Sequence, residues 1–237
     1  MPSPEGGFRE ASLAIPAGEV QLEGDLAIPA SSRGLVLFAH GSGSSRKSTR
    51  NRFVAHALQE RRLGTLLFDL LTATEERQDQ IDARLRFDIP LLAERLGEVT
   101  DWILRQVPTR GLRLGYFGAS TGAAAALIAA AERPEEVGAV VSRGGRPDLA
   151  AGALARVRAP TLLIVGGADP AVLELNREAL AELGGPKRLT VVAGASHLFE
   201  EPGALDEVAR LAGDWFYEHL GAAAGTRGHR GADASRV

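Results

Sequence analysis

The chain has 237 residues, of which 45% are hydrophobic, and this suits one large α/β domain better than two small ones. Its formal net charge of −3 and isoelectric point near 6.0 give no electrostatic sign of a nucleic-acid partner. It contains no cysteine, which excludes disulfides, thiolate metal sites and a cysteine nucleophile.

The two ends of the chain carry little structural signal. No long apolar run follows a basic start, so no signal peptide is expected. No run of about 18 apolar residues occurs, so we predict no membrane span and no membrane partner, with the cytoplasm as the expected compartment. The small and polar residues 221–237 predict a disordered tail, which leaves residues 1–220 as a single domain.

Strand and helix patterns alternate along the chain. Residues 8–15 and 20–28 alternate in polarity around Pro16-Ala17-Gly18, which predicts an antiparallel hairpin at a sheet edge. Mostly apolar runs predict buried strands at 35–39, 65–68, 112–117 and 137–141, and further strands are predicted at 161–165 and 188–192. Helices are predicted at 49–62, 89–107, 123–131, 171–183 and 204–220, with a short one before Pro160. The strongly charged residues 72–85 fit a solvated surface excursion or a short helix. The alternation predicts an α/β fold with a mostly parallel sheet of about eight strands, flanked by helices on both faces.

The turn Gly118-Ala119-Ser120-Thr121-Gly122 separates a predicted buried strand from an alanine-rich helix. A serine on a sharp strand-to-helix turn is typical of a nucleophile elbow, in which the backbone is strained and the hydroxyl stands clear of the sheet. Strand and helix pass so close there that side chains at 118 and 122 would collide. The alternative is an ordinary glycine-rich turn with a solvated serine.

Ligands of an open parallel sheet bind at the carboxyl ends of its strands. Ser120, Asp169 and His197 each follow a predicted strand, in the chain order nucleophile, acid, histidine. A serine hydroxyl needs an adjacent base, the role predicted for His197, and that base needs an orienting carboxylate, the role predicted for Asp169. Asp148 remains an alternative acid, whereas Asp69 is interpreted as a structural or pocket-edge residue.

The other histidines have simpler interpretations. His56 and His219 lie in predicted helices, and His229 lies in the predicted tail. His40 precedes a glycine-rich loop and is expected to shape that loop by hydrogen bonding, with a direct catalytic role as the minor alternative.

Two basic regions admit two readings each. Arg143 lies where a pocket wall is expected, so it either holds a substrate carboxylate or pairs with an acid on the surface. A second cluster is interpreted as a solvated loop and helix start, with an anion site as the alternative. This cluster consists of Arg46, Lys47, Arg50 and Arg52. We find no metal-ligand cluster, dinucleotide fingerprint or phosphate-binding loop in the sequence, so no cofactor or metal is expected.

Together these pieces resemble the α/β-hydrolase fold up to about residue 220. The matching motifs are His40-Gly41, the elbow at 118–122, Gly166 to Pro170 and Gly194 to His197. The single domain without a large cap is similar to the dienelactone-hydrolase-like branch. Dienelactone hydrolase proper uses a cysteine nucleophile, whereas this chain has Ser120, so the resemblance implies ordinary ester chemistry rather than dienelactone as the substrate.

The resemblance also implies an oxyanion hole. The backbone N–H of Thr121, at a helix N-terminus, supplies one donor, and the N–H of Ser42 supplies the other. His40, Gly41 and Arg143 are expected to line the substrate pocket.

The expected function is hydrolysis of small carboxylic esters or lactones through an acyl-enzyme by Ser120, His197 and Asp169. The expected partner is a small-molecule ester, and the sequence leaves monomer and homodimer open. Two alternatives remain, namely an acyltransferase that uses the same triad and a non-catalytic ligand-binding module on the same fold.

Overall fold

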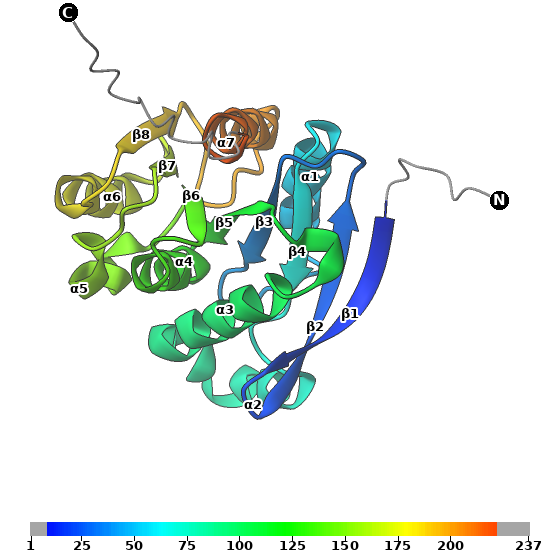
Figure 1. Cartoon of the computed structure of the whole chain (residues 1–237). Coiled ribbons are helices and arrows are strands. Elements are labelled where there is room, and N and C mark those ends of the chain that lie inside the picture. The colour runs from blue at the N-terminus through cyan, green and yellow to red at the C-terminus, as the bar shows by residue number, and fades with distance from the viewer. Residues whose placement is uncertain (1–8, 222–237) are drawn as a thin grey trace, which may run out of the picture.

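A computed structural model of the chain describes residues 9–221. They form a sheet of eight strands between two layers of helices (Figure 1). The strand order is β1-β2-β4-β3-β5-β6-β7-β8. The hairpin of β1 (Arg9–Ala17) and β2 (Val20–Ile28) is antiparallel, and β2 pairs antiparallel with β4. The other pairings are parallel, as predicted, between β3 (Gly34–Ala39), β4 (Gly64–Phe68), β5 (Arg113–Ala119), β6 (Val137–Arg143), β7 (Thr161–Gly166) and β8 (Lys187–Val192). Apart from Gly221, the predicted tail lies outside the described residues.

The central strands are mostly apolar because helices cover both faces of the sheet. Every residue of β3, β4, β6 and β7 is buried. The hairpin lies at one edge of the sheet, and β2 accordingly alternates between buried and more exposed side chains over most of its length. The polarity patterns of the sequence therefore report correctly which strands lie inside the sheet.

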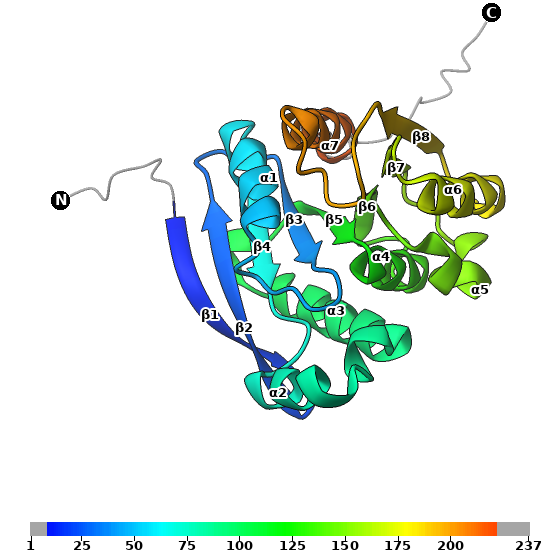
Figure 2. The same ribbon diagram turned by 180° about the vertical axis from the view of Figure 1, so that it is seen from behind.

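The helices divide between the two faces (Figures 1 and 2). On one face, α1 (Thr49–Glu60) packs against α7 (Ala204–Leu220), and Val54, Leu58 and Phe216 belong to the core beneath them. The other face carries α3 (Ile89–Ile103), α4 (Thr121–Glu132), α5 (Ala151–Leu154) and α6 (Pro170–Glu182). The first alanines of α4, at 123–126, are fully buried, and their small side chains let this helix lie close to the sheet.

The charged segment 72–85 is more than a solvated excursion. It folds into α2 (Ala73–Asp82), which opens with a capping box between Thr72 and Glu75. Glu75 also forms an ion pair with Arg95 of α3, and the buried Asp79 pairs with Arg86. These pairs anchor the segment to its neighbours, which charge content alone did not predict.

Two helices end earlier than predicted. The predicted helix 89–107 stops at Ile103, because the hydroxyl of Thr109 donates to the carbonyl oxygens of Ile103 and Gln106 and a 3-10 turn follows. The predicted helix 49–62 stops at Glu60, and Arg62 adopts a left-handed conformation with φ of 60°. Gly64 begins β4.

Candidate active site

The carboxyl ends of the parallel strands bring the predicted site residues to one edge of the sheet. β3 leads into His40, β5 into Ser120 and β7 into Asp169. β6 ends at Arg143, and the loop after β8 carries His197. Residues from five separate parts of the sequence therefore share the edge at which open parallel sheets bind ligands.

The turn at Ser120 has the geometry of a nucleophile elbow. Ser120 has φ of 51° and ψ of −120°, a sparsely populated conformation that costs about 1–3 kcal/mol. A Cβ atom at Gly118 would lie 2.4 Å from the Cα of Ala123, and one at Gly122 would lie 2.2 Å from the carbonyl oxygen of Ala39. The predicted close crossing of strand and helix is confirmed, and it explains both glycines.

Asp169 and His197 are in direct contact. Nδ1 of His197 lies 2.8 Å from Oδ2 of Asp169. Because an ionised carboxylate can only accept, Nδ1 is the donor in this contact, and Nε2 is the ring nitrogen that does not face Asp169. The loops that carry the two residues touch, since the N–H of Ala168 donates to the carbonyl oxygen of Ala195 at 2.9 Å. The other carboxylate oxygen of Asp169 faces the first turn of α6 and accepts from the N–H of Val172 at 3.4 Å.

Gly144 connects the histidine to the elbow. The N–H of Ser120 donates to the carbonyl oxygen of Arg143, the residue before Gly144. A Cβ atom at Gly144 would lie 3.6 Å from Cε1 of His197, so the imidazole ring lies close to the residue that follows Arg143. Within residues 9–221, no hydrogen bond joins the Ser120 hydroxyl to His197. Such bonds are often long before substrate binds and tighten in the complex.

The two predicted oxyanion donors line one small cavity. Ser42 and Thr121 share this cavity with Leu70 and Leu71. Gly41 brings the loop against the elbow, since a Cβ atom there would lie 3.1 Å from Cβ of Ser120. Thr121 is the first residue of α4, where the helix dipole adds to the attraction for negative charge.

His40 is built into the protein through both ring nitrogens. Its Nε2 accepts from the N–H of Leu70 at 3.0 Å, so Nδ1 carries the proton and faces the carbonyl oxygen of Gly41 at 3.0 Å. Burial lowers the pKa of His40 below its usual range, although the Gly41 carbonyl and Asp69 act in the opposite direction. His40 is therefore neutral at pH 7, and its contacts support the predicted role in shaping the loop.

Arg143 is buried without a counterion. The residue is 8% exposed, and neither Nε nor Nη1 has a hydrogen-bond partner within the described residues. Its guanidinium lies 5.9 Å from the ring centre of Phe199. Burial and the nearby charge of Arg50 lower the pKa of Arg143 to about 10, so it remains charged at neutral pH. The expected alternative, a surface arginine paired with an acid, is not what the structure shows.

The competing residues are occupied elsewhere. Asp148 accepts two hydrogen bonds from the guanidinium of Arg146, at 2.8 and 2.7 Å. His56 is exposed on α1, and the ring of His219 packs edge-on against Trp215 with ring centres 4.5 Å apart. The structure thus brings Asp169, rather than Asp148, to His197.

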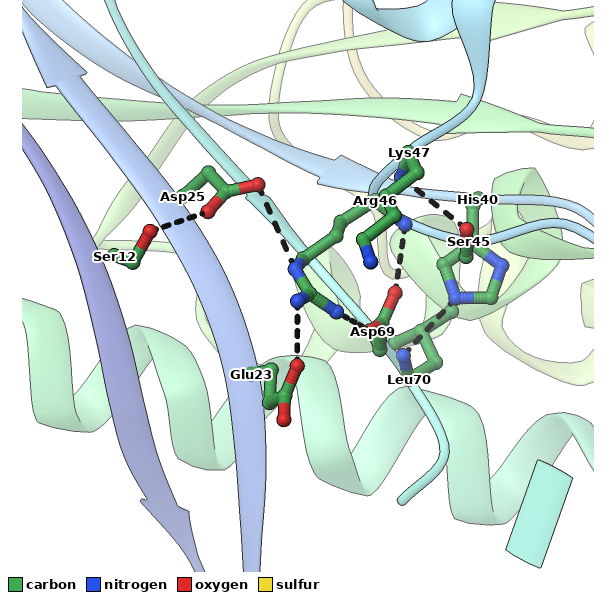
Figure 3. Close-up of polar contacts among 9 residues, drawn as sticks. All are labelled: Ser12, Glu23, Asp25, His40, Ser45, Arg46, Lys47, Asp69 and Leu70. Carbon is green, nitrogen blue, oxygen red and sulfur yellow. Dashed lines mark hydrogen bonds and ion pairs between the residues drawn. The ribbon is translucent and has the colours of Figure 1, made fainter. Parts of the chain in front are cut away.

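Lys47 and Arg52 are exposed, as interpreted from the sequence, whereas Arg46 departs from that interpretation. The side chain of Arg46 is only 15% exposed and forms ion pairs with Glu23, Asp25 and Asp69 (Figure 3). The three acids follow one another at intervals of 2 and 44 residues in the sequence, so no local pattern reveals their convergence. Sequence reasoning missed this cluster because only the pairing of β2 with β4 assembles it.

No helix within residues 9–221 is long and apolar enough to cross a membrane. The same part of the chain holds no group of three or more histidine or acidic side chains arranged to bind a metal ion.

Comparison with known proteins places the chain in a family. No family model matches the sequence. The crystal structure of a dienelactone hydrolase from Anabaena variabilis is 59% identical, covers 90% of this chain and 99% of its own, and superposes with a TM-score of 0.89. The chain belongs to the dienelactone hydrolase family. The resemblance inferred from the sequence motifs is confirmed, as is the α/β-hydrolase fold without a large cap.

The chain is also similar to two other proteins. Est1E from Butyrivibrio proteoclasticus shares the fold with a TM-score of 0.74 at 14% identity, covering 89% of this chain and 99% of its own. A candidate phosphoribosyl transferase of Mycobacterium tuberculosis is 58% identical over 213 residues, or 90% of this chain and 47% of that protein. The chain therefore spans about half the length of the curated relatives it matches.

Proposed function

We propose that the chain is a serine hydrolase that cleaves small carboxylic esters or lactones through an acyl-enzyme. The observation that carries this proposal is the 2.8 Å contact between Asp169 and His197 beside the strained turn of Ser120. Membership of the dienelactone hydrolase family supports hydrolysis as the reaction type. The assignment of serine as the nucleophile rests on the elbow, because the chain has no cysteine.

The geometry suggests a two-stage mechanism. Nε2 of His197 takes the proton as Oγ of Ser120 attacks the ester carbonyl, and Asp169 stabilises the imidazolium that forms. The N–H groups of Ser42 and Thr121 donate to the oxyanion of the tetrahedral intermediate. The intermediate collapses as His197 returns its proton to the leaving alkoxide. Water then attacks the acyl-enzyme with His197 as base, which releases the acid and restores the serine.

The first test is nucleophile replacement. Ser120→Ala should lose hydrolysis of a short p-nitrophenyl ester and labelling by a fluorophosphonate probe. Ser12→Ala provides a matched control, since Ser12 lies on the edge strand β1 and bonds only Asp25 among the described residues. Hydrolysis by Ser120→Ala at the parent rate would rule out this mechanism.

Two alternatives use the same fold. An acyltransferase would pass the acyl group to an added alcohol or amine, so the products formed with such an acceptor separate transfer from hydrolysis. A non-catalytic binding module would give no fluorophosphonate adduct at Ser120.

The name of the Mycobacterium tuberculosis relatives suggests a different activity. We assign phosphoribosyl transfer to the part of those proteins that this chain does not match, because the described strand ends carry a serine, an acid and a histidine. This chain alone should release no pyrophosphate from phosphoribosyl pyrophosphate and a nucleobase. Pyrophosphate release would reverse the assignment.

We also propose that Arg143 contacts the substrate. A buried guanidinium with two unpaired nitrogens favours an anionic substituent such as a carboxylate. Arg143→Gln should then raise the KM for a p-nitrophenyl hemisuccinate while leaving that for p-nitrophenyl acetate nearly unchanged. Equal changes for the two esters would show that Arg143 serves the fold instead.

A further inference from the structure

The loop of residues 41–45 carries the proposed oxyanion donor Ser42, and consecutive residues hold its two ends. At the first end, the N–H of Leu70 donates to Nε2 of His40 at 3.0 Å. At the second end, the N–H of Arg46 donates to Oδ1 of Asp69 at 2.7 Å, and the guanidinium of Arg46 pairs with Oδ2 of the same carboxylate (Figure 3). Asp69 and Leu70 therefore set the spacing between the two ends.

The anchor itself belongs to the sheet. Asp69 and Leu70 directly follow β4, and the N–H of Asp69 donates to the carbonyl oxygen of Glu23 in β2 at 2.9 Å. This bond continues the pairing of β2 with β4 by one residue. The loop is therefore held in place by the sheet and not by another loop.

Arg46 links this anchor to the hairpin. Its guanidinium also pairs with Glu23, and its Nε lies 3.5 Å from Oδ2 of Asp25, which accepts from the hydroxyl of Ser12. The side chains of Arg46 and Asp69 are 15% and 19% exposed, whereas those of Glu23 and Asp25 are 67% and 44% exposed. Solvent screens the outer two pairs, so the Arg46–Asp69 pair is the one that holds the loop.

Inside the loop, one backbone hydrogen bond runs from the N–H of Ser44 to the carbonyl oxygen of Gly41 at 3.2 Å. Gly41 and Gly43 contribute no side chains, and Gly43 has a left-handed φ of 66°. An oxyanion donor must nevertheless be held within about 0.5 Å of its working position. We propose that Arg46 is a positioning residue of the oxyanion loop, which fixes the N–H of Ser42 through its ion pair with Asp69. This inference rests on the proposed hydrolase function and adds a residue that touches neither substrate nor nucleophile.

Two substitutions test the ion pair between Arg46 and Asp69 while keeping the backbone hydrogen bond between the two residues. Arg46→Met removes the guanidinium and keeps the backbone N–H, and Asp69→Asn keeps an oxygen that can accept from that N–H but removes the charge. Both should lower kcat for p-nitrophenyl acetate by about 10- to 100-fold, with KM within about twofold of the parent, because misplacement by about 1 Å has this effect on rate. The kcat of Arg46→Lys should lie between that of Arg46→Met and that of the parent, since an ammonium cannot reproduce the paired hydrogen bonds of a guanidinium.

The control is a second arginine that forms ion pairs with more than one carboxylate. Arg210 on α7 pairs with Glu207 and Asp214 on the protein surface, so Arg210→Met removes a comparable number of ion pairs. Its kcat should match the parent. Hydrogen exchange gives a readout independent of turnover, because Arg46→Met should speed the exchange of amides 41–45 while Arg210→Met leaves them unchanged.

The outcomes separate this inference from the function on which it rests. Full activity of Ser120→Ala would reject the hydrolase mechanism, whatever Arg46 does. With that mechanism intact, an unchanged kcat for Arg46→Met would overturn the positioning role, even if exchange of the loop increased. A loss of kcat accompanied by faster exchange throughout the sheet would also overturn it, since Arg46 would then support the whole fold.

Discussion

Replacement of Gly122 by alanine tests the closeness of helix and sheet at the elbow. A Cβ atom at this position would lie 2.2 Å from the carbonyl oxygen of Ala39 and 2.4 Å from that of His40. A carbon atom needs about 3.5 Å from its neighbours, so α4 or the end of β3 must retreat by about 1 Å. Both obstacles are backbone atoms, which cannot rotate away.

The expected magnitude combines two opposing effects. Overpacking of a rigid contact costs about 1–3 kcal/mol, and the backbone obstacles favour the upper end of that range. Alanine has a helix propensity better than that of glycine by about 1 kcal/mol, which offsets part of the cost. We therefore expect Gly122→Ala to lower the free energy of unfolding by about 2 kcal/mol. The shift also reaches His40, where the oxyanion loop begins, so kcat of the folded variant should fall by about 100-fold.

Urea unfolding monitored by tryptophan fluorescence measures the stability, and ester hydrolysis in the absence of urea measures the rate. The matched control is Gly152→Ala in α5, where a Cβ atom would meet nothing within 4 Å. That variant should be as stable as the parent or more stable by up to about 1 kcal/mol, with the same kcat. Parental stability and kcat for Gly122→Ala would refute the close crossing.

Three further predictions follow from single contacts. Asp169→Asn should lower kcat by about 10³- to 10⁴-fold, because the amide no longer fixes the tautomer of His197. The unfolding midpoint of this variant in urea should stay near that of the parent, because asparagine can also cap α6. Tyr116→Phe should destabilise the protein by about 1 kcal/mol in urea unfolding with no change in kcat, because it removes a buried 2.7 Å hydrogen bond between α3 and β5. Hydrogen bonds from Arg95 lower the pKa of Glu75 to about 2, so stability present above pH 4.5 is lost as the pH falls toward 2. Glu75→Gln should therefore show a smaller decrease in urea midpoint between pH 5 and pH 3 than the parent.

The sequence predicted the elements that depend on local patterns. Continuous apolar runs predicted buried strands, because burial requires apolar side chains. The glycines at 118 and 122 predicted the elbow, because a close approach of strand and helix requires residues without a Cβ atom. Helix ends were less predictable. The hydroxyl of Thr109 ends α3 at Ile103, and this contact forms only once the chain has folded back.

The site shows the same division. The order of Ser120, Asp169 and His197 was readable, because each residue follows a strand and parallel strands end at one edge. The partners and the burial of the residues around the site could not be predicted from the sequence. Arg46 looked like part of a solvated basic cluster, and only the assembled sheet brings Asp69 and the acids of β2 to it. Arg143 looked more like a surface arginine than a buried one, since the number of its neighbours depends on loops that follow other strands.

The absence of a large cap has a consequence for the order of kinetic events. Enzymes of this fold that close a lid over the substrate must reopen it before product leaves, and that motion can limit turnover. Here the described strand ends carry loops and the helix α2, which is held to α3 by the ion pair between Glu75 and Arg95. Under the proposed serine mechanism, hydrolysis of the acyl-enzyme, rather than gating by a lid, is then the expected rate-limiting step for esters with a good leaving group.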